Sequence, residues 1–210
     1  MALLQEISEV MQSGNAPKVR ELVTQGLSEE VGPGALLNAL ISGMNVVGVK
    51  FKNNEVFVPE VLVAARAMNA GMDILKPVLE QGGVKPLGKV VIGTVMGDMH
   101  NIGKNLVRMM MVGAGLEVID LGTDVKPDAF VAAVEKEHPD IVAISALLTT
   151  TMLNMKAVIE ALKAAGLRDS VKVMIGGAPV TDNFAKNIGA DSYTPDAATA
   201  AEVAKEYVMC

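Results

Sequence analysis

The sequence predicts an α/β protein in which an N-terminal four-helix bundle precedes a flavodoxin-like, doubly wound parallel sheet of five strands. Two observations predict this fold. The hydrophobic period is helical before residue 85, and after it short β-branched runs alternate with helical stretches. We therefore expect a helical cap domain at residues 1–85 and an α/β domain at residues 86–210, joined by a linker at residues 81–88.

The composition is typical of a chain with a substantial core. Of its 210 residues, 50% are hydrophobic, and the net charge of −6 with only 3% aromatic residues argues against a nucleic-acid partner. The single cysteine, Cys210, excludes an internal disulfide. The first residues do not resemble a signal peptide, and the uncharged stretch 31–49 has the pattern of an amphipathic helix rather than a membrane span. We therefore expect a cytoplasmic protein with no membrane partner.

Four apolar stripes with helical spacing make up the N-terminal part. The first two cover residues 3–11 and 19–23, and Asn15 before the second suits a helix start. The third covers residues 37–51. The fourth covers residues 58–79 and repeats every seven residues, which suits packing against neighbouring helices. Short connections between these stripes favour a small bundle.

Five short β-branched runs in the C-terminal part are expected to be strands. Several are almost entirely apolar, which is typical of a parallel sheet covered on both faces. Right-handed crossovers favour the strand order 2-1-3-4-5. The predicted strands cover residues 89–95, 117–121, 140–145, 171–176 and 190–193, and the predicted helices lie near 103–114, 127–137, 151–165, 180–188 and 196–208.

Ligands of such sheets bind outside the carboxyl ends of the strands, where the strand order reverses. Here that point lies between the first and third strands. The loop after the first strand, residues 96–103, reads MGDMHNIG. Histidine is a common metal ligand, and Asp98 can reach a ring nitrogen of His100 from two positions away. The structural alternative is a solvated His100 in a loop that only caps the next helix.

Two more loops at the same edge have unusual content. Residues 145–151 read SALLTTT, and their hydroxyl groups can donate to a ligand or cap the following helix. The pair Gly176-Gly177 permits close approach of a bulky ligand, or forms an ordinary tight turn. The glycine spacing does not match a dinucleotide fingerprint, and Asp98 and His100 alone are too few for a zinc hydrolase.

These loops resemble the cobalamin-binding motif set of methionine synthase and its relatives in three places, Asp98-x-His100-x-x-Gly103, Ser145-x-Leu147 and Gly176-Gly177. Together with the helical module, the resemblance covers essentially the whole chain. The length and layout are similar to the corrinoid proteins of anaerobic methyltransferase systems. The resemblance implies a Rossmann-like domain that binds cobalamin or a related corrinoid base-off, with His100 as the lower axial ligand to cobalt.

The resemblance also implies roles for neighbouring residues. Asp98 would bind the far nitrogen of His100, and Thr151 would continue this relay at a position where methionine synthase has serine. Ser145 would hydrogen-bond the buried lower base of the cofactor. The implied catalytic group is Asp98, His100 and Thr151. The implied cofactor-binding set is Gly97, Asp98, Met99, His100, Asn101, Gly103, Ser145, Leu147, Thr149, Gly176, Gly177, Tyr193 and Asp196.

The function implied by the resemblance is methyl carriage. A substrate methyltransferase of the methanol, methylamine or aryl methyl ether type would place a methyl group on Co(I). A second methyltransferase would pass it from methyl-Co(III) to an acceptor such as tetrahydrofolate. The chain would be a non-catalytic subunit, and a reductive activase would restore oxidised cobalt. The alternatives are the cobalamin-binding subunit of a carbon-skeleton mutase and a cobalamin-dependent sensor.

The helical module could then cover the methyl group during transfer, with the linker at residues 81–88 as a hinge. The alternative for its apolar side chains is plain bundle core, since Met commonly fills gaps in cores. The candidate covering residues are Phe57, Val58, Val61, Leu62, Met68 and Met72.

Overall fold

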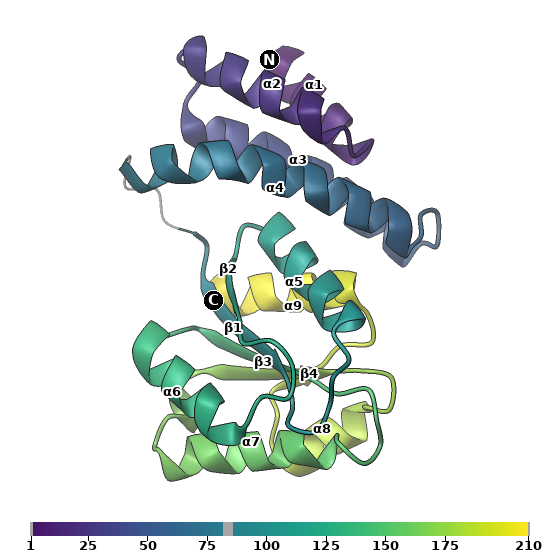
Figure 1. The fold of residues 1–210 in the computed structure, drawn as a ribbon, viewed down its shortest axis with the longest axis vertical. Coiled ribbons are helices and arrows are strands. Elements are labelled where there is room, and N and C mark those ends of the chain that lie inside the picture. The colour runs from purple at the N-terminus through teal and green to yellow at the C-terminus, as the bar shows by residue number, and fades with distance from the viewer. Residues whose placement is uncertain (1, 82–85, 210) are drawn as a thin grey trace. The chain divides into compact units, whose positions relative to one another are not determined.

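The computed structural model describes residues 2–81 and 86–209, which form two compact units (Figure 1). One unit contains the described residues up to Pro86 together with Gly113–Gly115. The other contains Leu87–Val112 and the described residues from Leu116 onward. The linker predicted at residues 81–88 falls in part on residues 82–85, which lie outside the described residues.

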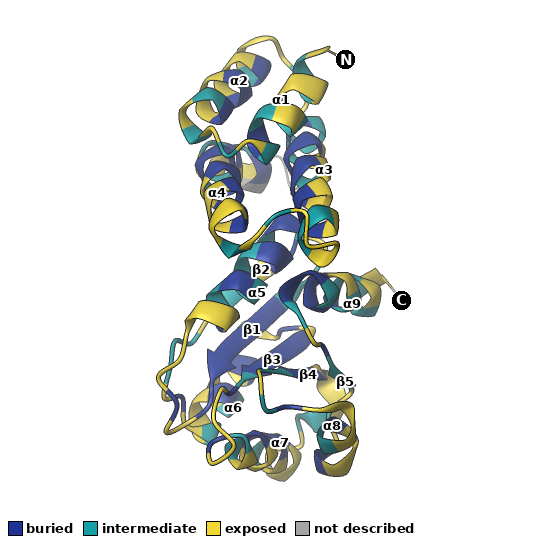
Figure 2. Ribbon diagram, turned by 90° about the vertical axis from the view of Figure 1, so that its right-hand side faces the viewer, coloured by how far each residue is buried: buried dark blue, intermediate teal, exposed yellow. Residues whose placement is uncertain are grey.

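Four helices form the N-terminal unit, as the sequence predicts. They are α1 (Ala2–Gln12), α2 (Ala16–Ser28), α3 (Pro33–Lys52) and α4 (Val58–Gln81). The start of α2 is capped by the Asn15 side chain, which accepts a hydrogen bond from the Lys18 amide at 3.2 Å. α1 packs against α3, α2 packs against α4, and α3 packs against α4. The buried face of each helix is therefore the apolar stripe that the sequence shows (Figure 2).

Among the described residues, α3 is the one helix long and apolar enough to cross a membrane, with a mean hydropathy of 1.3. Its side chains Leu36, Leu40, Met44 and Val47 are buried, and it packs against α1 and α4. This packing is that of a core helix in a bundle, and it agrees with the amphipathic pattern of residues 31–49.

The second unit is a parallel sheet in the order β2-β1-β3-β4-β5, so the predicted strand order 2-1-3-4-5 is confirmed. In Figure 1, α6, α7 and α8 cover one face of the sheet, and α5 and α9 cover the other. The strands are β1 (Lys89–Thr94), β2 (Glu117–Asp120), β3 (Ile141–Ser145), β4 (Lys172–Gly176) and β5 (Ser192–Tyr193). The helices are α5 (Ile102–Gly113), α6 (Pro127–Glu137), α7 (Leu153–Ala164), α8 (Asp182–Ile188) and α9 (Ala197–Met209), with a short 3-10 turn, η1, at Arg168–Ser170.

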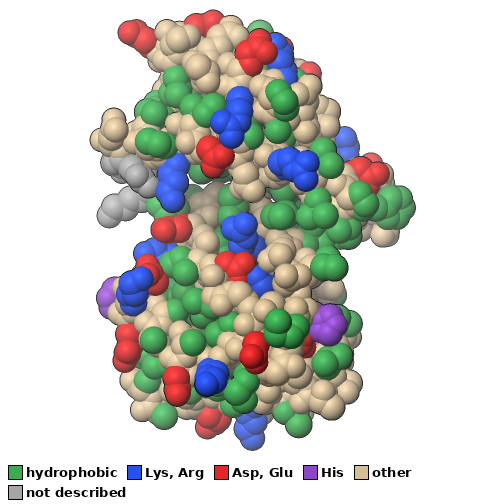
Figure 3. All heavy atoms as spheres, viewed as in Figure 1, with side chains coloured by type: hydrophobic (Ala, Val, Ile, Leu, Met, Phe, Trp, Pro, Cys, Tyr) green, Lys and Arg blue, Asp and Glu red, His purple; other side chains and the backbone are tan. Residues whose placement is uncertain are grey.

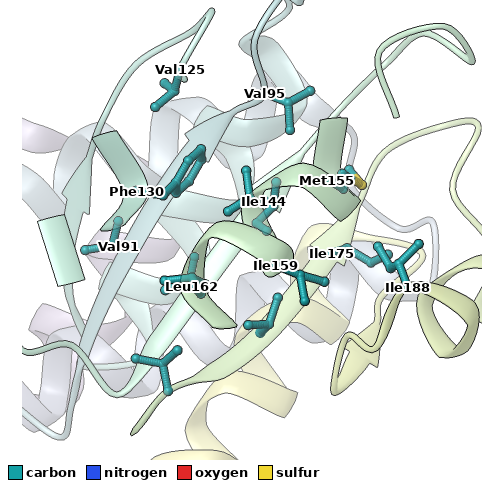
Figure 4. Close-up of a cluster of buried hydrophobic side chains, with 14 of the residues drawn as sticks. Val91, Val95, Val125, Phe130, Ile144, Met155, Ile159, Leu162, Ile175 and Ile188 are labelled. Atoms are coloured by element: carbon teal, nitrogen blue, oxygen red, sulfur yellow. The ribbon is translucent and has the colours of Figure 1, made fainter. Parts of the chain in front are cut away.

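One large apolar cluster fills the face covered by α6, α7 and α8 (Figure 4). Phe130 of α6 and Leu162 of α7 are fully buried against Val91 of β1 and the neighbouring strands. This burial explains why β1, β3 and β4 read as nearly continuous apolar runs, because both faces of these strands are covered. The cluster gives the carboxyl ends of the three strands a rigid base.

Three predicted elements, β5, α7 and α8, begin two residues later than the sequence suggests. β5 covers only Ser192–Tyr193 instead of residues 190–193, because Gly189 adopts a φ of +81° and caps the end of α8. α7 begins at Leu153 rather than at residue 151. Thr151 lies in the turn before the helix, where its side chain donates a hydrogen bond to Asp98.

Candidate functional site

The three motif-bearing loops meet at one edge of the sheet. Thr94 at the end of β1 pairs with Ser145 at the end of β3, which in turn pairs with Gly176 at the end of β4. The strands are parallel and in register, so their following loops emerge side by side. The structure therefore brings together the loop that holds His100 and the loop that holds Thr151.

The Asp98 carboxylate is the centre of this edge. Its side chain is 0% exposed, although it carries a charge. Its Oδ1 accepts hydrogen bonds from the His100 amide at 3.0 Å and from His100 Nδ1 at 2.7 Å. Its Oδ2 accepts from the Leu147 and Leu148 amides at 2.8 and 3.3 Å and from Thr151 Oγ1 at 2.7 Å. One buried carboxylate thus joins the loop after β1 to the loop after β3.

Burial and these hydrogen bonds together set the pKa of the Asp98 carboxyl group, and so its charge. Burial alone would raise the pKa of its carboxyl group, because it disfavours the charged form. Hydrogen bonds from the Leu147 amide, the Thr151 hydroxyl, and the amide and ring of His100 outweigh burial and hold the pKa far below its ordinary value. Asp98 is therefore an anion at neutral pH, and it can accept from every one of these donors.

The His100 ring is oriented by this anion. Its side chain is 50% exposed, with Nδ1 directed at Asp98. Because an ionised carboxylate can only accept, the neutral ring carries its proton on Nδ1, and Nε2 of that tautomer has the lone pair. A carboxylate on one nitrogen and a free lone pair on the other is the usual arrangement of a metal-binding histidine.

The surroundings of His100 suit a metal that brings its own ligands. Among the residues that the structure describes, no group of three or more His, Cys, Asp or Glu side chains could hold a metal ion. Large apolar side chains of the His100 loop and of the loop after β3 are exposed instead, with Met99 at 70%, Ile102 at 73% and Leu147 at 42%. Figure 3 shows histidine side chains at the surface of the molecule. This set fits a flat, largely apolar ring better than a bare cation.

Gly176, the last residue of β4, and Gly177, which follows it, differ in what a side chain at each position would meet. Gly177 has a φ of +133°, and a Cβ there would lie 1.8 Å from the Ala146 carbonyl oxygen. The requirement at this position thus comes from the chain's own backbone. At Gly176 the nearest atom to such a Cβ would be the Thr194 carbonyl oxygen, at 3.4 Å. Gly97, Asn101, Gly103 and Thr149, the other predicted loop residues, are all exposed.

The contacts of Tyr193 and Asp196 lie away from the His100 loop. Tyr193 packs against the apolar cluster on the face of the sheet that α6, α7 and α8 cover. Both carboxylate oxygens of Asp196 accept from Thr199, through its amide and its hydroxyl, each at 2.8 Å. Asp196 is therefore the cap of α9, and these contacts give neither residue a part in orienting His100.

Sequence reasoning missed three residues that hold the loop. Thr94, which is fully buried, donates from Oγ1 to the His100 carbonyl oxygen at 2.9 Å. Asn154 donates to the Met96 carbonyl oxygen at 2.7 Å, and Asp124 accepts from the Gly97 amide at 2.7 Å. A threonine in an otherwise apolar strand was a usable signal for Thr94. The other two come from distant elements and left no local pattern.

The 2-1-3-4-5 parallel sheet, with a carboxylate-oriented histidine at its switch point, agrees with the resemblance to cobalamin-binding proteins that the loop motifs carry. Residues 88–204 match the family model described as a B12 binding domain, and residues 3–76 match a second model of the same description. The chain therefore belongs to the family of B12-binding corrinoid proteins.

Relatives match over nearly the full length. A corrinoid protein of Desulfitobacterium hafniense (strain Y51) is 41% identical, over 98% of this chain and 97% of its own. A dimethylamine corrinoid protein of Methanosarcina acetivorans is 42% identical, over 99% and 97%. The crystal structure of the methanol:cobalamin methyltransferase complex from Methanosarcina barkeri has a chain with a TM-score of 0.89 and 32% identity, covering 99% of this chain and 80% of that one.

Proposed function

We propose that this chain is a corrinoid protein that carries a methyl group from a substrate methyltransferase to a second methyltransferase. The similarity that carries this proposal is the near full-length match to corrinoid proteins named for dimethylamine and to a chain of a methanol:cobalamin methyltransferase complex. The methyl donor would be a methylamine or methanol, and tetrahydrofolate is a candidate acceptor. A reductive activase would be a third partner.

Two observations of the site fit a corrinoid. The first is the free Nε2 of a half-exposed, carboxylate-oriented His100. The second is Gly103, the second residue of α5, where a Cβ would meet nothing within 4 Å. Glycine weakens a helix, and no packing among the described residues requires it here. The open space above it is available to a ligand.

The bound corrinoid would supply cobalt as the atom that takes up and releases the methyl group. His100 would hold it from below through Nε2. Asp98 would keep the His100 proton on Nδ1, and Thr151 would keep Asp98 aimed at the ring by donating to its other oxygen. Ser145, half-buried at the end of β3, would contact the displaced lower base, while Leu147 and Met99 would offer apolar surface to the ring.

We propose a boundary near residues 85–86 between a helical cap and the corrinoid-binding domain. Of the predicted covering residues, Val61 and Met68 are buried and belong to the apolar core. Phe57 is 63% exposed and Leu62 is 36% exposed. These two are therefore the better candidates for shielding the methyl group from water.

The first test is the absorbance spectrum of protein reconstituted with cobalamin under anaerobic conditions. The wild type is expected to give a histidine-bound, base-off spectrum, and His100→Ala is expected to lose it. His138→Ala is the matched control, because His138 is exposed at the end of α6 and should keep the wild-type spectrum. Identical spectra for all three proteins would remove His100 as the axial ligand.

The second test follows a labelled methyl group. Reduced, reconstituted protein is incubated with a methylamine- or methanol-specific methyltransferase and its labelled substrate, and then separated by gel filtration. The label should stay with the wild type and leave it when a second methyltransferase and tetrahydrofolate are added. A protein that binds corrinoid but never takes up label from either substrate class would contradict methyl carriage from these donors.

A further inference from the structure

We propose that Asp124, in the loop after β2, is a positioning residue that sets the orientation of the His100 ring. This inference rests on the proposed function, since it assigns His100 to the metal. The hydrogen bonds of Asp124 go to the backbone of the loop that carries Asp98, and its effect on the ring would pass through that backbone.

Asp124 forms hydrogen bonds to two consecutive residues of that loop. Its carboxylate Oδ1 accepts a hydrogen bond from the Gly97 amide at 2.7 Å. Its own amide donates to the Asp98 carbonyl oxygen at 3.0 Å. Together these bonds hold the backbone on either side of the Asp98 α-carbon, so they limit the directions its carboxylate can take.

The backbone of Asp124 is held in an unusual conformation. Its φ is +55°, in the left-handed region that non-glycine residues seldom adopt. Aspartate tolerates this region better than most residues. Directly after it, the Val125 amide donates to the Thr94 carbonyl oxygen at 2.9 Å, and Val125 forms a parallel bridge with Val95. The segment after β2 is thus fastened to the end of β1, where the His100 loop begins.

Asp124 is one of three residues from other elements that hold this loop, and Asn154 holds Met96 just before the two residues that Asp124 contacts. Thr94 holds the far side through the His100 carbonyl oxygen, and Asp124 holds the near side through Gly97 and Asp98. Without the hydrogen bonds from Asp124, the backbone at Asp98 can rotate. The hydrogen bond between the Asp98 carboxylate and His100 Nδ1 would then be weaker. The ring would then lose its single tautomer and its fixed direction.

Three variants separate the parts of this argument. Asp124→Gly removes the carboxylate but adopts a positive φ freely, so the variant is expected to fold. Asp124→Asn keeps an oxygen acceptor and tolerates the same φ, and it should rescue the wild-type behaviour. Asp140→Ala is the matched control. Asp140 is also an exposed aspartate that accepts from a backbone amide, that of Lys89 at 2.7 Å, but it lies at the opposite end of β1.

The first readout is nitrogen NMR of the histidine rings without any cofactor. The chain has two histidines, and exposed His138 serves as the internal reference. Wild type, Asp124→Asn and Asp140→Ala should show His100 as the tautomer protonated at Nδ1. Asp124→Gly should show mixed or exchange-broadened His100 signals, with His138 unchanged. An unchanged His100 pattern in Asp124→Gly, or loss of the pattern in Asp124→Asn, would overturn the proposal.

The second readout is the affinity for hydroxocobalamin, followed by absorbance. Asp124→Gly should bind about tenfold more weakly than the wild type, the size typical of losing a group that orients a metal ligand. Asp140→Ala should stay within about twofold of the wild type, because surface changes away from a site have small effects. Equal weakening by Asp124→Gly and Asp140→Ala would reduce Asp124 to a general stabilising contact. If the wild type itself fails to bind, the proposed function falls, while the NMR comparison still decides the positioning role.

Discussion

Replacing Asp98 with alanine is expected to lower the free energy of unfolding by about 3 kcal/mol, because it breaks a buried, charged hydrogen-bond network from one side. The Leu147 amide and the Thr151 hydroxyl, which donate to Asp98 at 2.8 and 2.7 Å, would be left without their acceptor. Urea unfolding measures this loss. Asp73→Ala is the control, since Asp73 pairs with Arg20 at the surface and should change stability by less than about 1 kcal/mol. Similar losses in both variants would contradict the central place of Asp98.

The same carboxylate predicts how stability depends on pH. The folded-state pKa of Asp98 is lowered, so its contribution to stability is complete above the ordinary pKa of about 4 and is lost as the pH falls below that value. Between about pH 2 and pH 4 the Asp98 carboxyl group is protonated to a greater extent in the unfolded chain than in the folded one. Wild-type stability therefore rises with pH in this range. Asp98→Asn lacks this group. Its slope in this window should be shallower by up to about 1.4 kcal/mol per pH unit, and parallel curves would refute the assignment.

Gly177→Ala is expected to be the most damaging single-methyl change at this edge of the sheet. The new Cβ would lie 1.8 Å from the Ala146 carbonyl oxygen, and alanine would have to keep a φ of +133°. Conformational strain and overpacking each typically amount to about 1–3 kcal/mol, so we expect a loss of about 4 kcal/mol. Thermal or urea unfolding measures it.

The neighbouring glycine provides the control for this prediction. A Cβ at Gly176 would come no closer than 3.4 Å to its nearest atom, the Thr194 carbonyl oxygen. Gly176→Ala should therefore lower stability by less than about 1.5 kcal/mol. If the two variants lose the same stability, the close approach of Gly177 to Ala146 is not what fixes glycine there.

The fold was readable from the sequence because its determinants are periodic and local. Helical stripes before residue 85 and apolar runs after it indicated two kinds of architecture, and the crossover rule then favoured the order 2-1-3-4-5 that the sheet has. Element ends were harder to place. Gly189 ends α8 with a positive φ and so delays β5, a conformation that the residue type permits but does not demand.

The candidate site was readable to the extent that its groups are close in sequence. Asp98 and His100 are two positions apart, so their spacing allows the hydrogen bond that the structure shows between them, although it left a solvated His100 as the alternative. The bond from the Gly97 amide to Asp124 spans 27 positions, and the bond from Asn154 to the Met96 carbonyl oxygen spans 58. Residues so far apart in the sequence come together only when the strands pair. A short sequence motif therefore cannot predict these hydrogen bonds.

The division of the Asp98 carboxylate between two loops sets a limit on engineering. One oxygen serves the loop of residues 96–103, and the other serves the turn at residues 147–151. A transplant of the first segment alone into a foreign parallel sheet would leave half of that carboxylate without donors. Both segments, with the register that aligns them, form the smallest transferable module.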